Sequence, residues 1–111
     1  MGNWTIDEQR WAAMPLMEQM ANIGSEVGRT RKWLGKNKTQ LAEGAFYRGL
    51  ELLDATIKSG RCNSNMASRS CLLLELCRAR DYFSETFLNC DLDSMAYLEK
   101  YFGQFASAIR R

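Results

Sequence analysis

Residues 16–34 read LMEQMANIGSEVGRTRKWL, and this stretch decides the fold class of the chain. Its apolar residues recur in alternating steps of four and three: Leu16, Met20, Ile23, Val27 and Leu34, with Thr30 filling one place. This spacing puts one side chain per turn on a single face, which is typical of a helix packed in a bundle. Pro15 precedes the stretch and Gly35 follows it, and these residue types favour a helix start and a helix end. We therefore predict an amphipathic helix over residues 15–34.

The same spacing recurs in three further stretches, over about residues 38–59, 67–89 and 92–109. Their apolar stripes are Phe46, Leu50, Leu53 and Ile57; Leu72, Leu76, Ala79, Phe83 and Cys90; and Met95, Leu98, Phe102, Phe105 and Ile109. Gly60 ends the second helix, and Asp91 is a good N-cap for the last one. Four such helices with short connections predict an all-α fold, an antiparallel up-down-up-down four-helix bundle. The competing all-α arrangement is a pair of long helical hairpins that completes its core by dimerising.

The first 14 residues precede this pattern. Thr5 and Glu8 fit a capping box, so we expect a short lead-in helix over residues 6–13 with Thr5 as its N-cap. Pro15 then either starts the next helix at its first position or kinks a continuous one. A chain of 111 residues has the usual size of one domain. Within it we expect a lead-in over residues 1–14 and the bundle over residues 15–111.

The composition narrows the possible chemistry. The chain has no His, which removes Ser/His, Cys/His and Glu-x-x-His sites. Its acids stand singly along polar faces, it has no Gly-rich phosphate loop after a strand, and its four Cys match no zinc spacing. We therefore expect a non-enzymatic protein with no catalytic residue, no metal and no cofactor. The start carries charges unlike a signal peptide, and no apolar run could span a bilayer, so we expect a cytoplasmic protein with free thiols and no membrane partner.

Two glycines inside the first long helix need an explanation. Gly24 and Gly28 lie four residues apart on one face, and each costs about 0.5–1 kcal/mol relative to Ala. We expect them to allow the close approach of a neighbouring helix, or of a large side chain such as Trp33 or Phe102. A ligand or partner resting on the bare backbone is the alternative.

Arg80 is unusual because it lies in register with two apolar residues, Leu73 and Phe87. A charge on a half-buried face needs a partner. Asp54, at a flanking position of the second helix, is the candidate, and we expect a structural ion pair.

The sharpest charge feature is a basic run between Val27 and Ala42 that contains no acid. Its cations are Arg29, Arg31, Lys32, Lys36 and Lys38. We expect this run, with Arg78, Arg110 and Arg111 behind it, to bind nucleic acid, RNA in the first place, through salt-dependent phosphate contacts. The net charge of +2 is small, so this interpretation depends on where the charges lie. The alternative is that these cations complement the helix macrodipole and are offset by Asp81, Glu85, Asp91 and Asp93.

The aromatic residues exceed what one slim core requires; they include Trp4, Trp11, Trp33, Tyr47, Tyr97 and Tyr101. Trp and Tyr are enriched at protein interfaces. We therefore expect a homo-oligomer or a stable protein partner, with packing inside the monomer as the alternative.

Three stretches resemble small bacterial four-helix-bundle proteins of uncharacterised function: residues 21–29 (ANIGSEVGR), 45–54 (AFYRGLELLD) and 97–110 (YLEKYFGQFASAIR). The resemblance covers residues 15–111. In length and helix order the chain is also similar to the four-helix-bundle proteins encoded in ribosomal-RNA intervening sequences, and to the accessory variability protein of diversity-generating retroelements. In the latter comparison, residues 72–81 (LLLELCRARD) and 98–105 match the third and fourth helices. That resemblance implies a basic, barrel-like homopentamer that binds a reverse transcriptase and its template RNA.

These observations together predict an oligomeric, non-enzymatic adaptor that binds RNA and a protein partner, with a reverse transcriptase as the candidate partner. The alternative is a purely protein-binding module, such as the antitoxin-like partner of a neighbouring enzyme, that binds no nucleic acid.

Overall fold

The computed structural model describes residues 6–59 and 66–109, with the side chains of residues 6–58 and 73–109. These residues form helices and no strand, which confirms the all-α class within the described ranges. The helices are α1 (Glu8–Ala13), α2 (Leu16–Gly35), α3 (Thr39–Ser59), α4 (Met66–Leu88) and α5 (Leu92–Ile109). The bounds of α2 to α5 lie within one residue of the predicted ranges.

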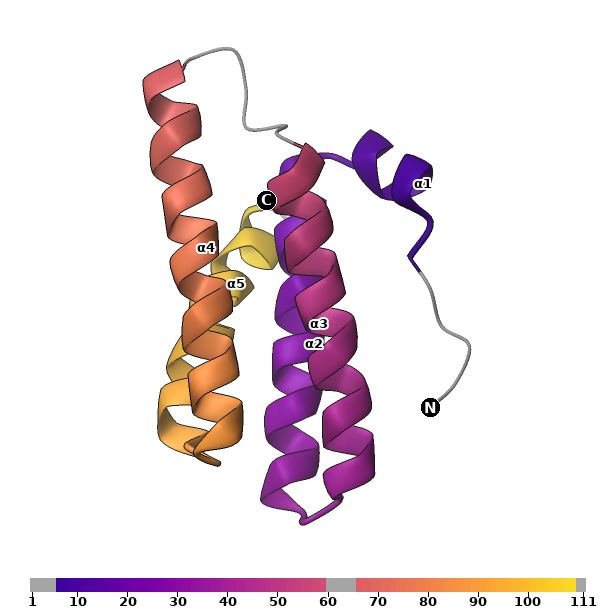
Figure 1. Ribbon diagram of the computed structural model, residues 1–111, viewed down its shortest axis with the longest axis vertical. Coiled ribbons are helices and arrows are strands. Elements are labelled where there is room, and N and C mark those ends of the chain that lie inside the picture. The colour runs from indigo at the N-terminus through magenta and orange to yellow at the C-terminus, as the bar shows by residue number, and fades with distance from the viewer. Residues whose placement is uncertain (1–5, 60–65, 110–111) are drawn as a thin grey trace.

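The helices pack as a bundle in which α2 is central. Along its length α2 contacts α5 and α3, whereas α4 contacts α3 and α5 less extensively. Figure 1 shows α2 and α3 side by side, and α4 and α5 joined at the same end of the molecule as the turn between α2 and α3. None of the helices in the described part of the chain combines the length and apolar composition that a bilayer-spanning segment needs.

The core follows the predicted stripes closely. The side chains with no exposed surface include Met20, Ile23, Val27 and Thr30 from α2, Leu53 from α3, Leu76 and Phe83 from α4, and Met95 and Phe102 from α5. Phe46 on α3 contacts two rings of α4. Its ring centroid lies 4.1 Å from that of Phe87, in a stacked arrangement, and 5.0 Å from that of Phe83, edge to face. Ile109, predicted on the last stripe, is exposed, and the side chain of Leu72 lies outside the described set.

Two turns of the same type end α2 and α4. Asn37 and Cys90 have φ angles of 59° and 51°, in the left-handed region. The N–H of Lys38 donates to the carbonyl of Trp33 and that of Asp91 to the carbonyl of Thr86, as in a Schellman motif. The prediction that Cys90 belongs to the buried stripe is therefore wrong. The chain has already left the helix at Leu88, so helical spacing no longer places Cys90 inside, and it is exposed.

The lead-in helix begins later than the sequence predicted. Its N-cap is Asp7, whose carboxylate accepts a hydrogen bond from the N–H of Arg10 at 3.1 Å, while Thr5 lies outside the described residues. Met14 and Pro15 are extended, with ψ near 138° and 145°, so Pro15 separates α1 from α2 instead of kinking one helix. Pro15 is the N-cap of α2 and not its first helical residue, because an extended ψ directs the chain into a new helix axis.

One tryptophan holds α1 on the bundle. Trp11 is buried, and its indole N–H donates to the hydroxyl of Thr56 on α3 at 3.0 Å. The buried amide of Gln19 donates to the carbonyls of Trp11 and Met14 at 2.7 and 3.2 Å. These contacts make the lead-in helix part of the packed structure, because they satisfy polar groups that would otherwise be buried alone.

The two glycines of α2 set its approach to α5, as predicted. A Cβ on Gly24 would lie 2.7 Å from the Cβ of Phe102, and a Cβ on Gly28 would lie 2.8 Å from a carboxylate oxygen of Glu99. On α3, a Cβ on Gly49 would lie 2.9 Å from the ring of Phe83. Real Cβ atoms essentially never approach so closely. At Gly24 a side chain would push α2 and α5 apart, because the Cβ of Phe102 is fixed to its backbone, whereas at Gly28 it would displace the flexible end of Glu99.

Candidate functional site

The basic run of α2 divides into two parts in the structure. Arg29 and Arg31 are paired within the chain, the first with Glu26 at 3.1 Å and the second with Glu99 on α5 at 2.7 Å. Gly28 leaves the room that Glu99 occupies. Their charges are therefore partly neutralised, by an acid one turn away on α2 for Arg29 and by an acid on a different helix for Arg31.

The second part of the basic run consists of the lysines around Trp33. The ammonium groups of Lys32 and Lys36 lie 4.9 and 5.7 Å from the ring centroid of Trp33, which is within the range of a cation–π contact. Trp33 is half-buried, and Lys32, Lys36 and Lys38 are exposed. Within residues 6–59 and 66–109 these three lysines have no ion pair. We call Lys32, Trp33, Lys36 and Lys38 the lysine–tryptophan patch.

Acidic residues lie at the same end of the molecule. A Cβ on Gly35 would lie 3.8 Å from the side chain of Leu92, so the turn between α4 and α5 meets the end of α2 (Figure 1). Asp91 and Asp93 flank Leu92. Asp91 caps α5 by accepting hydrogen bonds from the N–H and hydroxyl of Ser94 at 3.1 and 2.8 Å, and these bonds lower its pKa. Asp91 and Asp93 therefore lie at the same end of the molecule as the basic run, and neither forms an ion pair with it among the described side chains.

The other predicted cations do not join the patch. Arg78 is exposed on α4, where it lines a separate groove, and Arg110 and Arg111 lie outside the described residues. Arg48 pairs with Glu26 at 3.4 Å. The predicted pair of Arg80 and Asp54 is confirmed, with N···O distances of 2.5 and 3.3 Å, and this hydrogen bonding raises the pKa of Arg80.

A buried carboxylate escaped the sequence analysis. Glu26 was expected on a solvated face, but it is only 8% exposed, and it pairs with both Arg29 and Arg48. Gly49 explains the burial, because the missing side chain lets α3 lie close to Glu26; a Cβ there would be 3.4 Å from the Cβ of Glu26. The three-residue spacing of Glu26 and Arg29 was the one sign of this pair in the sequence.

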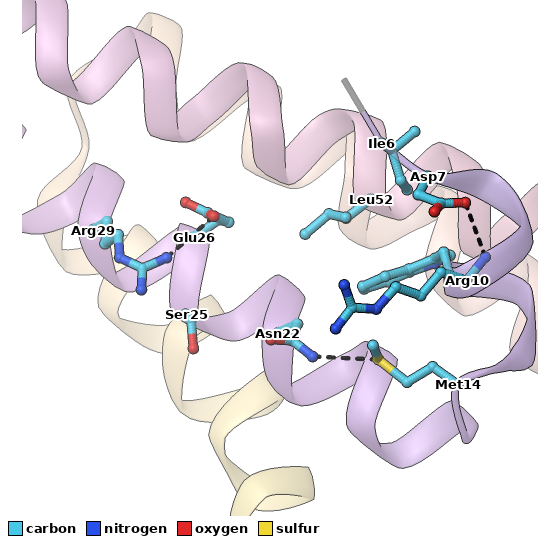
Figure 2. A pocket seen from close by; sticks show the side chains of 10 residues that line it. Ile6, Asp7, Arg10, Met14, Asn22, Ser25, Glu26, Arg29 and Leu52 are labelled. Atoms are coloured by element: carbon cyan, nitrogen blue, oxygen red, sulfur yellow. Dashed lines mark hydrogen bonds and ion pairs between the residues drawn. The ribbon is translucent and has the colours of Figure 1, made fainter. Parts of the chain in front are cut away.

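Beside Glu26 lies an open pocket of about 380 Å³ between α1, α2 and α3 (Figure 2). Its lining consists of Ile6, Asp7, Arg10, Trp11, Met14, Asn22, Ser25, Glu26, Arg29 and Leu52. Figure 2 shows the pair of Glu26 and Arg29 at one end and the side chain of Arg10 across the pocket from it. Both acids are engaged, Asp7 as the cap of α1 and Glu26 with its arginines. Among the described residues the guanidinium of Arg10 has no ion pair, so the pocket presents this cation beside an apolar wall.

A third surface lies between α4 and α5. It is a shallow groove of about 410 Å³, which we call the α4–α5 groove, lined by Glu75, Arg78, Ala79, Tyr82, Tyr97, Leu98 and Tyr101. The hydroxyl of Tyr101 donates to the carboxylate of Glu75, and burial together with this bond raises the pKa of Tyr101. Tyr97 is 74% exposed at the rim. The groove thus combines tyrosine faces with an unpaired arginine.

No cluster of three or more potential metal ligands occurs in the part of the chain that the structure describes. In comparisons with known proteins, the chain matches no family model, no curated protein and no solved structure.

Proposed function

We propose that this protein is a non-enzymatic adaptor, an up-down-up-down four-helix bundle that binds single-stranded RNA through the lysine–tryptophan patch. The observation that supports the proposal is the position of two lysine ammonium groups beside the half-buried indole of Trp33. Proteins that bind single strands combine an aromatic face, on which a base stacks, with cations that contact the backbone phosphates. The patch supplies both from one helix end.

The residues of the patch determine how much each interaction contributes to the free energy of RNA binding. Stacking of one base on an aromatic side chain contributes about 1–3 kcal/mol. Lys32, Lys36 and Lys38 can neutralise up to three phosphates, for which the logarithm of affinity would fall with the logarithm of salt with a slope of about −2. Arg29 and Arg31 contribute less, because their guanidinium groups already face Glu26 and Glu99.

Fluorescence anisotropy of a labelled single-stranded RNA, measured over a series of salt concentrations, tests this proposal. We expect Trp33→Ala to weaken binding roughly 5- to 150-fold, which corresponds to the loss of one stacked base. We expect Lys36→Ala to reduce the magnitude of the salt slope by about 0.7. Lys100→Ala is the matched control, because it removes one exposed lysine from α5.

Two results would contradict the proposal: no salt-dependent binding by the unaltered protein, or the same loss in Lys100→Ala as in Lys36→Ala. A single-stranded DNA of the same sequence, measured in parallel, distinguishes a preference for RNA from binding to any single strand.

The exposed tyrosines of the α4–α5 groove favour a second candidate function, a purely protein-binding module. In that case reversing the charges of Lys32 and Lys36 would leave function intact, whereas altering Tyr82 or Tyr97 would abolish it. A reverse transcriptase bound to its template RNA is the partner that the resemblance implies. Binding of that reverse transcriptase complex to the lysine variants and to the tyrosine variants distinguishes the two functions. Loss in the lysine variants supports RNA binding, and loss in the tyrosine variants supports the protein-binding module.

A further inference from the structure

Helix α4 carries apolar side chains on its inner side and, mixed with charged ones, on its outer side. Toward the core it presents Leu76, Ala79 and Phe83, which are buried. On the outside it carries Leu74 and Tyr82, which are exposed. Within the described chain, α4 packs mainly against α3 and α5.

The outer side of α4 continues into the α4–α5 groove. Tyr82 from α4 and Tyr97 and Tyr101 from α5 line it, with Ala79 and Leu98 between them. Tyrosine and arginine are enriched among the residues that contribute most to binding between proteins.

The charges on this side complement one another within the same helix. Among the side chains of residues 6–58 and 73–109, neither Arg78 nor the exposed Asp81, three residues later, forms an ion pair. A two-fold axis that crosses α4 between these residues would place the helices of two copies antiparallel. Arg78 of each copy would then face Asp81 of the other, as a self-complementary interface requires.

We propose that the α4–α5 groove is covered by a second copy of this chain, related by a two-fold axis, with Tyr97 and Tyr82 as the central contacts. The proposal goes beyond RNA binding and uses a different surface, so either can fail alone. The dimer would carry two lysine–tryptophan patches, and a strand long enough to reach both would bind more tightly than either patch allows.

Sedimentation velocity over a range of protein concentrations tests the dimer. We expect the unaltered protein to approach twice the 12.7 kDa mass of one chain. We expect Tyr97→Asp to raise the dissociation constant of the dimer at least about tenfold, the effect of losing one central contact. Tyr47→Asp is the control, since Tyr47 is 49% exposed on α3, away from the groove. Circular dichroism establishes that both variants fold.

A charge exchange tests the two-fold pairing itself. Arg78→Glu and Asp81→Arg should each weaken self-association, while a mixture of the two variants should form a heterodimer, because the reversed charges then face one another. A monomer at every concentration, an equal effect of Tyr47→Asp, a mixture that stays monomeric, or a larger ring such as a pentamer that is insensitive to Tyr97→Asp would overturn the proposal.

Discussion

Replacing Gly24 with alanine would change two free-energy contributions of opposite sign. In the interior of a helix, alanine is more favourable than glycine by about 0.5–1 kcal/mol. Against this gain stands the contact with α5, because the new Cβ would lie 2.7 Å from the Cβ of Phe102 and 3.5 Å from its carbonyl carbon. Neither atom can move without moving the backbone of α5.

The steric contribution is the larger of the two. Forcing an extra methyl group into a well-packed interior costs about 1–3 kcal/mol. Phe102 has no exposed surface, so its side chain has no free volume into which it could rotate. We therefore expect Gly24→Ala to lower the free energy of unfolding by about 1–2 kcal/mol, after the helix-propensity gain is subtracted. Each kcal/mol corresponds to roughly 4–8 °C in Tm for a domain of this size.

Gly103 on α5 provides a matched control, because a Cβ there has nothing within 4 Å. Gly103→Ala should show the propensity gain alone and raise stability by about 0.5–1 kcal/mol. Urea and thermal denaturation followed by circular dichroism measure both variants. If Gly24→Ala is as stable as the unaltered protein or more so, the close approach of α2 to α5 does not limit the packing and the reasoning is refuted.

Two further predictions concern polar contacts. Thr56→Val should destabilise the protein by about 1–3 kcal/mol, because the buried indole N–H of Trp11 loses its acceptor; an unchanged denaturation midpoint would show that this bond does not hold α1. Asp91→Ala should lower Tm at neutral pH, whereas Asp91→Asn, which keeps the capping oxygen, should lower it less. Hydrogen bonds from Ser94 lower the pKa of Asp91 in the folded protein. The charged carboxylate therefore stabilises the fold at every pH above the ordinary Asp pKa of about 3.9. This stabilisation is lost as the pH falls through the lowered pKa of the folded state. The Tm difference between Asp91→Ala and the unaltered protein should therefore shrink in acid, and a difference independent of pH would contradict the assignment.

Periodicity and terminus chemistry predicted the helices well because both are local. Met20, Ile23 and Val27 are buried as their spacing requires, and Asp91 caps α5. The wrong predictions for the apolar stripes fall at positions where the chain leaves the helix and helical spacing no longer applies. Cys90 continues a helical stripe by its number, but it lies in a turn with positive φ, where the helical repeat no longer applies.

For the candidate site, the sequence identified the basic run. It did not show that Arg29 and Arg31 are paired with acids while Lys32, Lys36 and Lys38 are exposed. Arg31 and Glu99 are 68 residues apart, so no spacing rule connects them, and their contact depends on how closely α2 and α5 approach at Gly28. The pairing of Arg80 with Asp54 was predictable because both residues lie beside buried stripes, and such a charge needs a partner.

By itself, therefore, the sequence determined that this chain is helical, where its four long helices begin and end to within one residue, and which face of each packs inward, since hydrophobic spacing and capping act within a few residues of one another. Only the tertiary structure decided which charges remain available. The distance between helices at Gly24, Gly28 and Gly49 buries Glu26 and brings Glu99 to Arg31, while Lys32 and Lys36 stay beside Trp33 and Arg78 stays exposed on α4. Ion pairing and burial depend on atoms brought together from distant parts of the chain, and that juxtaposition is a property of the packed bundle.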